Sequence, residues 1–286
     1  MSEVVKAIAD SALLVFVAGS MLGAGLRLTV REILQPLRNA RLVALALVAN
    51  FVLVPLLAYL ILLAIPLDRP LKVGLILLST AGGAPFLPVL ARFAKGNVAF
   101  SVGLMIVLMV VTVVYMPVVL PLLLPGVEVS PWEIARNLIL LMLLPLGIGL
   151  LFRARSEAVA EILRKIADNA TNYSLVLVLA LILTLHFNGI ISVIGSGAIL
   201  AGAIFMVGAF LLGYLLGGPG SDTKRVLGLA TGQRNIAAAM LVASRNFSEP
   251  MVIVMLLIVT LLGLFIQIPV AMKLGTRRRD NVSVSA

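Results

Sequence analysis

The chain has 286 residues, of which 62% are hydrophobic and only 12% are charged, and its formal net charge is +10. Soluble domains carry about 25% charged residues, so this composition indicates an integral membrane protein and excludes an ordinary soluble domain. The absence of cysteine excludes disulfides and thiolate chemistry, and one histidine cannot build a zinc site.

Apolar stretches of about twenty residues follow one another with short connections, as bilayer-spanning helices do. We predict nine such segments, at 11–30, 42–65, 71–91, 98–124, 134–152, 170–187, 196–217, 226–244 and 250–272. They leave almost no chain for an extramembrane domain. The predicted fold is therefore all-α, with a single transmembrane domain over residues 1–286 embedded in the lipid bilayer.

The basic residues lie mostly in the short loops between these segments, and they divide unevenly between the two sides. The side of the N-terminus carries only Lys6, Arg69, Lys72, Arg136 and Arg245. The opposite side carries the others, apart from one arginine inside a segment. Because basic loops stay in the cytoplasm, we expect the N-terminus outside and the C-terminus in the cytoplasm, in a plasma or inner membrane. The positive charge thus indicates topology and not a nucleic-acid partner.

Two of the segments contain residues that interrupt helices. The third segment has Ala81 to Pro85 after an ordinary helical stretch, and the eighth has Thr231 to Asn235. Non-helical backbone at bilayer depth is tolerated only where it is buried in protein or lines a cavity. Interrupted helices at matching places in two halves are typical of inverted-repeat transporters and their central sites.

The order of the segments predicts an internal repeat. We expect one repeat at about 11–124 and a second, inverted one at about 134–274, with the two broken helices crossing at the centre. The fifth segment, 134–152, has no counterpart in this pairing. A helix before 11–30 is therefore expected to be absent from the first repeat.

Arg234 is a cation in the middle of the eighth segment. Placing an arginine at bilayer depth costs roughly 2.5 to 3.5 kcal/mol, which suggests a function for it. All the carboxylates fall in loops or at segment ends, so none is available at the bilayer centre. We interpret the guanidinium as the positive charge for an anionic substrate, aided by the N-terminal ends of the second half-helices. The alternative is that it caps free carbonyl groups at the helix breaks.

The residues at the two breaks form the predicted substrate site. Its members are polar or small residues from both interrupted segments: Arg234, Asn235, Gln233, Thr231, Gly232, Gly82 and Gly83.

Four stretches resemble the bile acid:sodium symporter family. They are Met21 to Leu26, the pair Gly82 and Gly83, Ala94 to Ser101, and Gly232 to Asn235. The resemblance implies two inverted five-helix repeats, often without the first helix, divided into a core and a panel domain. It assigns 11–30, 134–152 and 170–187 to the panel, and about 42–124 and 196–272 to the core.

The chain departs from the sodium-coupled members of this family at the second break. It has Ala230 where they carry a glutamate and Arg234 where they carry a glutamine. Asn50, Ser101 and Asn235 still match ligand positions, so the resemblance implies a weak sodium site there at most. Arg234 would repel Na⁺ by about 4 kcal/mol at ~4 Å and an effective dielectric constant of ~20.

The sequence predicts a secondary transporter that moves a small organic anion by alternating access, with the core shifting against the panel. The replaced ligand positions and Arg234 argue against sodium coupling, and the coupling ion or exchange mode stays open. Two alternatives stay open: a sodium-coupled symporter that uses Asn50, Ser101, Asn235 and backbone carbonyls, and a sensor that binds without transport. An enzyme is not expected, because there is no HExxH motif and the single histidine, His186, lies at the end of a segment. Beyond a possible Na⁺, no cofactor is predicted, and the oligomeric state stays open.

Overall fold

The computed structural model describes residues 3–34, 38–124, 130–185 and 187–283 of the chain. Over these residues the secondary structure is helical, without strands. His186 lies outside the described residues. The predicted all-α membrane fold is confirmed at this level.

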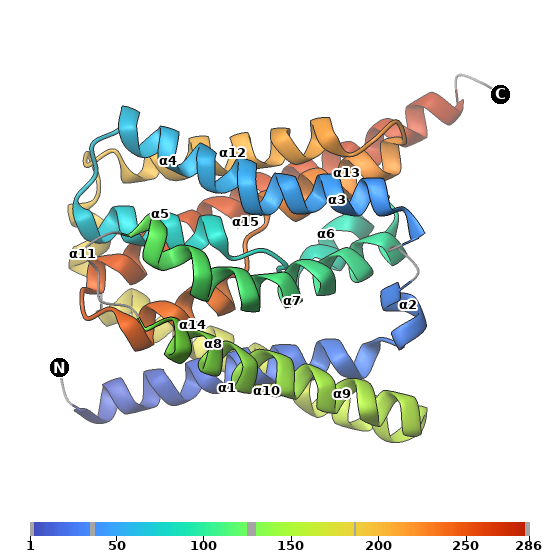
Figure 1. Cartoon of the computed structure of the whole chain (residues 1–286), viewed down its shortest axis with the longest axis horizontal. Helices are drawn as coiled ribbons and strands as arrows, with labels where there is room; N and C mark the ends of the chain where they lie inside the picture. Colours follow the sequence, from blue (N-terminus) through green and yellow to red (C-terminus); the bar gives the residue numbers. More distant parts are fainter. Residues whose placement is uncertain (1–2, 35–37, 125–129, 186, 284–286) are drawn as a thin grey trace.

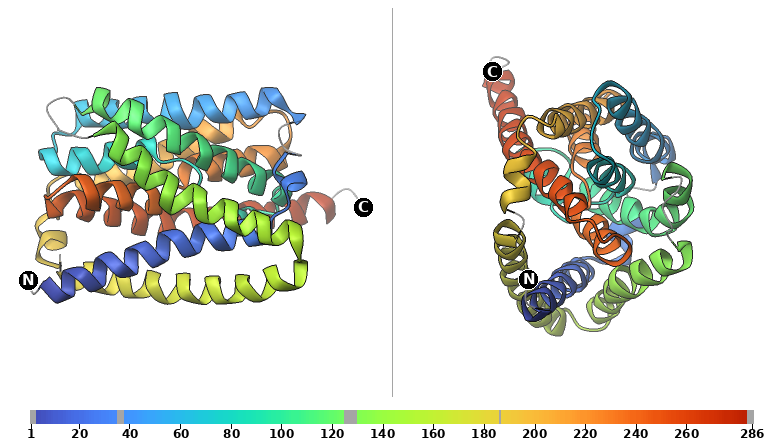
Figure 2. Two further views of the ribbon diagram at one scale, coloured as in Figure 1. Left: turned by 60° about the horizontal axis from the view of Figure 1, so that its bottom comes forward. Right: turned by 90° about the vertical axis from the view of Figure 1, so that its left-hand side faces the viewer.

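The helices form two groups (Figure 1). The smaller group contains α1 (Glu3–Arg27), α8 (Pro131–Leu138), the π-helical turn η3 (Ile139–Leu143), α9 (Leu144–Arg155) and α10 (Glu157–Leu185). Within it, α1 packs along both α9 and α10, and the end-on view in Figure 2 shows the same grouping. These are the segments that the family resemblance assigns to the panel.

The larger group holds both interrupted segments. It contains α3 (Ala40–Val48), the π-helical turn η2 (Ala49–Leu53), α4 (Val54–Ala64), α5 (Arg69–Thr80), α6 (Leu87–Phe93), α7 (Val98–Leu123), α12 (Ala198–Leu216), α13 (Ser221–Gly232), α14 (Ile236–Asn246) and α15 (Pro250–Ser283). The short helices α2 (Val30–Leu34) and α11 (Phe187–Ser192) lie in connections. Because α14 contacts both α1 and α8, the two groups meet near the second break.

Seven helices in the described part of the chain are long and apolar enough to cross a bilayer. The predicted segments 71–91 and 170–187 are not among them. The first is split into α5 and α6, of 12 and 7 residues. The second belongs to the end of α10, and part of it lies outside the described residues. A membrane-spanning bundle is confirmed, whereas the count of nine spans and the inverted repeat stay predictions.

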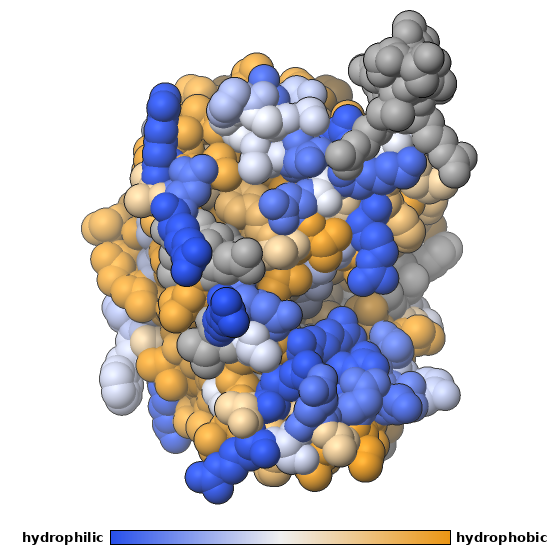
Figure 3. Space-filling model, turned by 90° about the vertical axis from the view of Figure 1, so that its right-hand side faces the viewer, coloured by the Kyte–Doolittle hydropathy of each residue, from blue (hydrophilic) through white to orange (hydrophobic). Residues whose placement is uncertain are grey.

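The end of the molecule at which α1 and α9 finish has a broad hydrophilic surface (Figure 3). Ion pairs join the smaller helix group there: Arg27 contacts Asp168, and Arg164 bonds both Asp168 at 2.9 Å and Glu161. The hydrogen bond from Arg164 lowers the pKa of the Glu161 carboxyl below its ordinary value. This clustering of charge at one end fits the predicted loops, while the side of the membrane that it faces stays a prediction.

The π-helical turn η2 interrupts the regular α-helix between α3 and α4. Pro55 has no N–H to donate to the carbonyl of Phe51, four residues earlier, and the hydroxyl of Tyr115 on α7 donates to it instead. The two rings also pack, with centroids 4.8 Å apart. This bond joins α7 to η2, the turn that contains Asn50.

Replacing Tyr115 with phenylalanine removes the hydroxyl that donates to the Phe51 carbonyl, and the residue four positions later, Pro55, has no N–H to replace it. We expect the Tyr115→Phe variant to lose about 1 to 2 kcal/mol of unfolding free energy, measured by thermal or denaturant unfolding in detergent. Tyr173→Phe is the matched control, because Tyr173 is 77% exposed on α10. Equal stability of the two variants would contradict this role for the Tyr115 hydroxyl.

Candidate functional site

The helices are interrupted where the sequence predicts, and the two breaks touch. The backbone N–H of Asn235 donates to the carbonyl of Ala81 at 2.9 Å, which joins the segment between α13 and α14 to the segment between α5 and α6. The side chain of Asn235 adds a second link, because its Nδ2 donates to the carbonyl of Gly83 at 3.1 Å. Its Oδ1 accepts from the N–H of Ala238 and so caps α14.

We call the place where the two breaks touch the crossing. Arg234 lies there and is only 4% exposed. Its Nε donates to the carbonyl of Leu78 at 2.9 Å, and its Nη2 donates to the carbonyl of Ser79 at 2.8 Å. Its Nη1 donates to Oδ1 of Asn50 at 2.7 Å and to the carbonyl of Thr231 at 3.2 Å. The guanidinium therefore binds oxygen atoms from three separate helical elements.

Three of these oxygen atoms are backbone carbonyls in the last turns of helices, and the fourth is Oδ1 of Asn50. The carbonyl of Leu78 also accepts from the N–H of Ala81 at 3.1 Å. Leu78 and Ser79 are in the last turn of α5, and Thr231 is in the last turn of α13. The last four carbonyls of a helix have no partner within it, and together they carry a partial negative charge. Two such ends meet at Arg234, so its charge is balanced by carbonyl dipoles. Arg234 thus caps the C-terminal ends of α5 and α13, which is the alternative role that the sequence analysis left open.

Capping does not use all of the guanidinium. Arginine has five N–H groups, and the hydrogen bonds above occupy one on Nε, two on Nη1 and one on Nη2. Among the described residues, no acceptor pairs with the second N–H of Nη2. A ligand that accepted from this N–H would leave the cap intact.

Other residues of the first break are held by α7. Oγ1 of Thr112 accepts from the N–H of Gly82 at 2.9 Å and donates to the carbonyl of the same glycine at 3.1 Å. Gly83 has a φ of +79°, and a Cβ added there would lie 2.4 Å from the backbone nitrogen of Met109. The backbone of Gly82 is therefore bonded to α7, and the absence of a side chain at Gly83 lets the first break pack closely against α7.

The three side-chain oxygens of the predicted weak sodium site each belong to a group that already makes a hydrogen bond within the protein. Oδ1 of Asn50 accepts from Arg234, and Oδ1 of Asn235 accepts from a backbone N–H. Oγ of Ser101 donates locally to the carbonyl of Val98 at 2.6 Å. The guanidinium of Arg234 donates to Oδ1 of Asn50 at 2.7 Å and would repel a cation at that oxygen.

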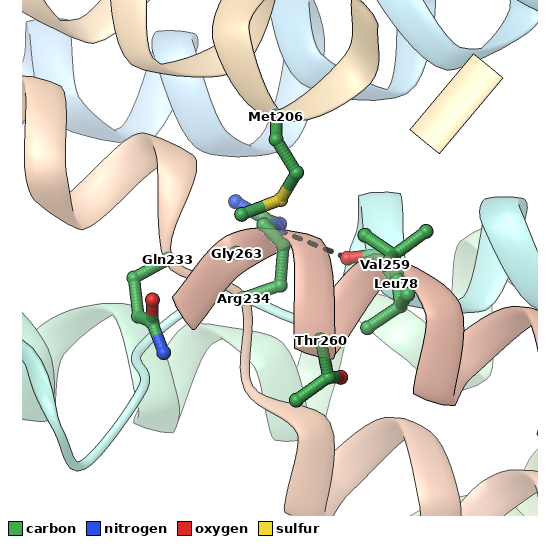
Figure 4. A pocket seen from close by; sticks show the side chains of 7 residues that line it. All are labelled: Leu78, Met206, Gln233, Arg234, Val259, Thr260 and Gly263. Atoms are coloured by element: carbon green, nitrogen blue, oxygen red, sulfur yellow. Dashed lines mark hydrogen bonds between the residues drawn. The ribbon is translucent and has the colours of Figure 1, made fainter. Parts of the chain in front are cut away.

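A small cavity of about 10 Å³ lies beside the guanidinium, between α5, the second break, α12 and α15 (Figure 4). It is lined by Leu78, Met206, Gln233, Arg234, Val259, Thr260 and Gly263. This volume holds about one water molecule. In Figure 4 the guanidinium points towards Met206, whereas the amide of Gln233 lies on the other side. An organic anion needs more space than this conformation provides.

The structure brings Arg234, Asn235 and Thr231 close to Gly82 and Gly83, while their role in substrate binding stays a prediction. Sequence reasoning missed two residues that face the breaks. Thr112 is a hydroxyl in an apolar segment, with no pattern to single it out. Gln267 is buried in α15 at 1% exposure, beside Gly232. A glutamine in the middle of an apolar span was the available signal for this second residue.

The geometry at Gly83 predicts a sharp effect of one added methyl group. We expect Gly83→Ala to lower the free energy of unfolding by more than about 2 kcal/mol, because the left-handed backbone and the contact with Met109 both oppose a Cβ. Gly147→Ala on α9 is the control, since a Cβ there meets nothing within 4 Å. Thermal unfolding in detergent compares the two, and a Gly83→Ala variant as stable as the control would refute this view of the break.

Comparison with known proteins identifies similar sequences. The sequence model of the Sodium Bile acid symporter family matches residues 12–196. A protein of Oryza sativa subsp. japonica, named a probable chloroplastic sodium/metabolite cotransporter, BASS2, is 30% identical over 252 residues, which cover 82% of this chain and 57% of that protein. The corresponding BASS3 protein of Arabidopsis thaliana is 24% identical over 233 residues, covering 79% and 54%. The chain thus spans about half the length of these curated relatives.

Proposed function

We propose that this chain, which belongs to the Sodium Bile acid symporter family, carries a small organic anion across a membrane by alternating access. Members of this family are transporters and not enzymes, and the relatives above are named for sodium and metabolite cotransport. The observation that carries the choice of an anion is the buried guanidinium of Arg234 at the crossing, with one N–H left unused.

The charge balance of the interior supports an anionic ligand. The buried charged residues in the described part of the chain are Arg225 and Arg234, without a buried carboxylate. Arg225 lies elsewhere, where its Nη1 donates to the carbonyl of Ala94 at 3.1 Å. A carboxylate beside Arg234 would form a charge-assisted hydrogen bond, and the N-terminus of α14 adds a favourable dipole. The proposed substrate contacts are Arg234, Asn235, Gln233, Thr231 and Gly232 from the second break, with Gly82 and Gly83 from the first.

In this proposal Arg234 also takes the place of a coupling cation. Carbonyl and amide oxygens at half-helix C-termini are the ligands that Na⁺ uses in such transporters. Here the oxygens of Leu78, Ser79, Thr231 and Asn50 surround a guanidinium instead. Arginine stays protonated at any useful pH, so it neither leaves like Na⁺ nor carries a proton.

The proposed motion is a shift of the larger helix group against the smaller one. The crossing is tied together by backbone and side-chain bonds within the larger group, so it would move as a unit. The narrow cavity beside Arg234 requires such a movement before an anion can enter. We assign residues 42–124 and 196–272 to the moving core and 11–30, 134–152 and 170–187 to the panel, in an inverted repeat of nine spans. The N-terminus would face the outside.

The first test concerns coupling. Purified protein in proteoliposomes is given a mixture of unlabelled small organic acids, and the accumulated acids are identified by mass spectrometry in sodium chloride and in choline chloride. We expect equal uptake in both salts, because the cation position is already filled. Uptake that collapses in choline would overturn the sodium-independent mechanism, and the absence of any uptake would leave the transport proposal refuted.

The second test removes the guanidinium and asks whether Na⁺ binds in its place. In Arg234→Gln the oxygens that now bind the guanidinium are free, and we expect Na⁺ to stabilise this variant relative to choline, whereas the wild type responds equally to both. A Na⁺ concentration of ten times the dissociation constant would add about 1.4 kcal/mol, read as a rise in melting temperature. Arg225→Gln removes the other buried guanidinium and should gain no response. Sodium stabilisation of the wild type, or none in Arg234→Gln, contradicts the proposal.

A further inference from the structure

Gln267 is a polar side chain without a partner in an otherwise well-paired interior. It lies on α15 with 1% of its surface exposed, and neither its Nε2 nor its Oε1 has a hydrogen bond to any residue that the structure describes. An unpaired buried polar group costs about 1 to 3 kcal/mol. The other buried polar side chains that face the breaks, among them Asn50, Thr112, Thr231 and Asn235, are all hydrogen-bonded. Gln267 is therefore missing a partner.

The amide of Gln267 lies against the end of the first half of the eighth segment. A Cβ added to Gly232, the last residue of α13, would lie 2.7 Å from Nε2 of Gln267. The carbonyls of Ala230 and Gly232 at this helix end accept no hydrogen bond from the described residues outside α13, whereas that of Thr231 is bound by Arg234. Glycine at 232 thus lets an unpaired amide approach a helix end that has acceptors to spare.

Gln267 also lies on the side of α15 that borders the Arg234 cavity. Thr260 and Gly263 line that cavity, and Gln267 follows Gly263 by one helical turn, about 6 Å along the axis. Thr260 is already satisfied, since its Oγ1 donates to the carbonyl of Leu256 at 2.6 Å. The unpaired amide of Gln267 therefore lies one helical turn beyond Gly263, the last residue of α15 that lines the cavity beside Arg234.

We infer that Gln267 binds a hydroxyl group of the transported anion, so that the substrate is a small hydroxy acid. A hydroxyl group both donates and accepts, and it can satisfy Oε1 and Nε2 of the amide together. A second carboxylate would only accept and would leave Oε1 unpaired, while an ammonium group would face repulsion from Arg234. The carboxylate of the acid takes the remaining N–H of Arg234. This inference rests on the proposed function and deepens it.

The test uses three acids that differ in their hydroxyl groups. Propanoate has none, lactate has one and glycerate has two, while all three share the carboxylate and the chain length. Each acid is titrated against the full-length purified protein in detergent, and the melting temperature is recorded. We expect lactate or glycerate to bind at least tenfold more tightly than propanoate, because a site built to pair with a hydroxyl rejects the analogue that lacks it.

Two variants assign this preference to Gln267. In Gln267→Met, which nearly conserves volume, we expect the hydroxy acids to lose their advantage while propanoate still binds. Gln267→Leu serves as a second variant, and neither should lower the melting temperature of the ligand-free protein, since each removes an unpaired polar group. Asn246→Leu is the matched control, because its amide is satisfied by the carbonyl of Val242 at 2.9 Å, and it should keep the preference.

The outcomes separate this inference from the proposed function. Equal shifts by the three acids in the wild type would overturn the hydroxyl site and would indicate that a bound water satisfies Gln267. A preference that persists in both Gln267 variants would overturn it as well. If none of the three acids stabilises the wild type while other organic anions do, the hydroxy-acid inference fails alone. If no organic anion stabilises it, the proposed function fails.

Discussion

The crossing depends on one constraint: backbone carbonyls at bilayer depth must have partners. Two interrupted helices end there, and their last turns present several carbonyls that no helix can satisfy. Arg234 binds those of Leu78, Ser79 and Thr231 together, so a single side chain closes both ends. Its charge and their dipoles compensate each other, which explains how an arginine can be 4% exposed without a carboxylate beside it.

The remaining polar groups at the crossing divide into those that hold it and those that are unused. Asn235 and Thr112 tie the first break to α14 and α7, and Tyr115 fixes the turn that presents Asn50. These bonds make the crossing a rigid unit. By contrast, one N–H of Arg234 and the amide of Gln267 bind nothing in the described part of the chain. Unpaired groups persist in a folded interior at a cost in stability, and ligand binding can offset that cost.

Much of this arrangement could be predicted from the sequence, because its causes are local. Glycine and proline at 82–85 break a helix whatever surrounds them, and a charge at position 234 stands out from an apolar segment. The contacts of Arg234 could not be predicted, since they depend on how two distant helix ends meet. Gln267 could have been noticed as a glutamine in an apolar span, but its lack of a hydrogen-bond partner among the described residues is visible only in the structure. The π-helical turn at Asn50 has no simple signature, whereas the interruption of segment 71–91 was predicted from its glycine and proline residues.

Replacing a dissociable ion with a tethered one changes what can drive transport. A symporter gains its driving force because the ion binds on one side and leaves on the other, whereas a guanidinium crosses with the protein and returns with it. In the proposed cycle Arg234 therefore contributes affinity for an anion but no work from a sodium gradient. The energy must come from the gradient of the substrate, from exchange, or from an ion bound elsewhere. In this proposal, the carbonyl oxygens around Arg234 are the place where a guanidinium separates a carrier driven by its substrate from one driven by sodium.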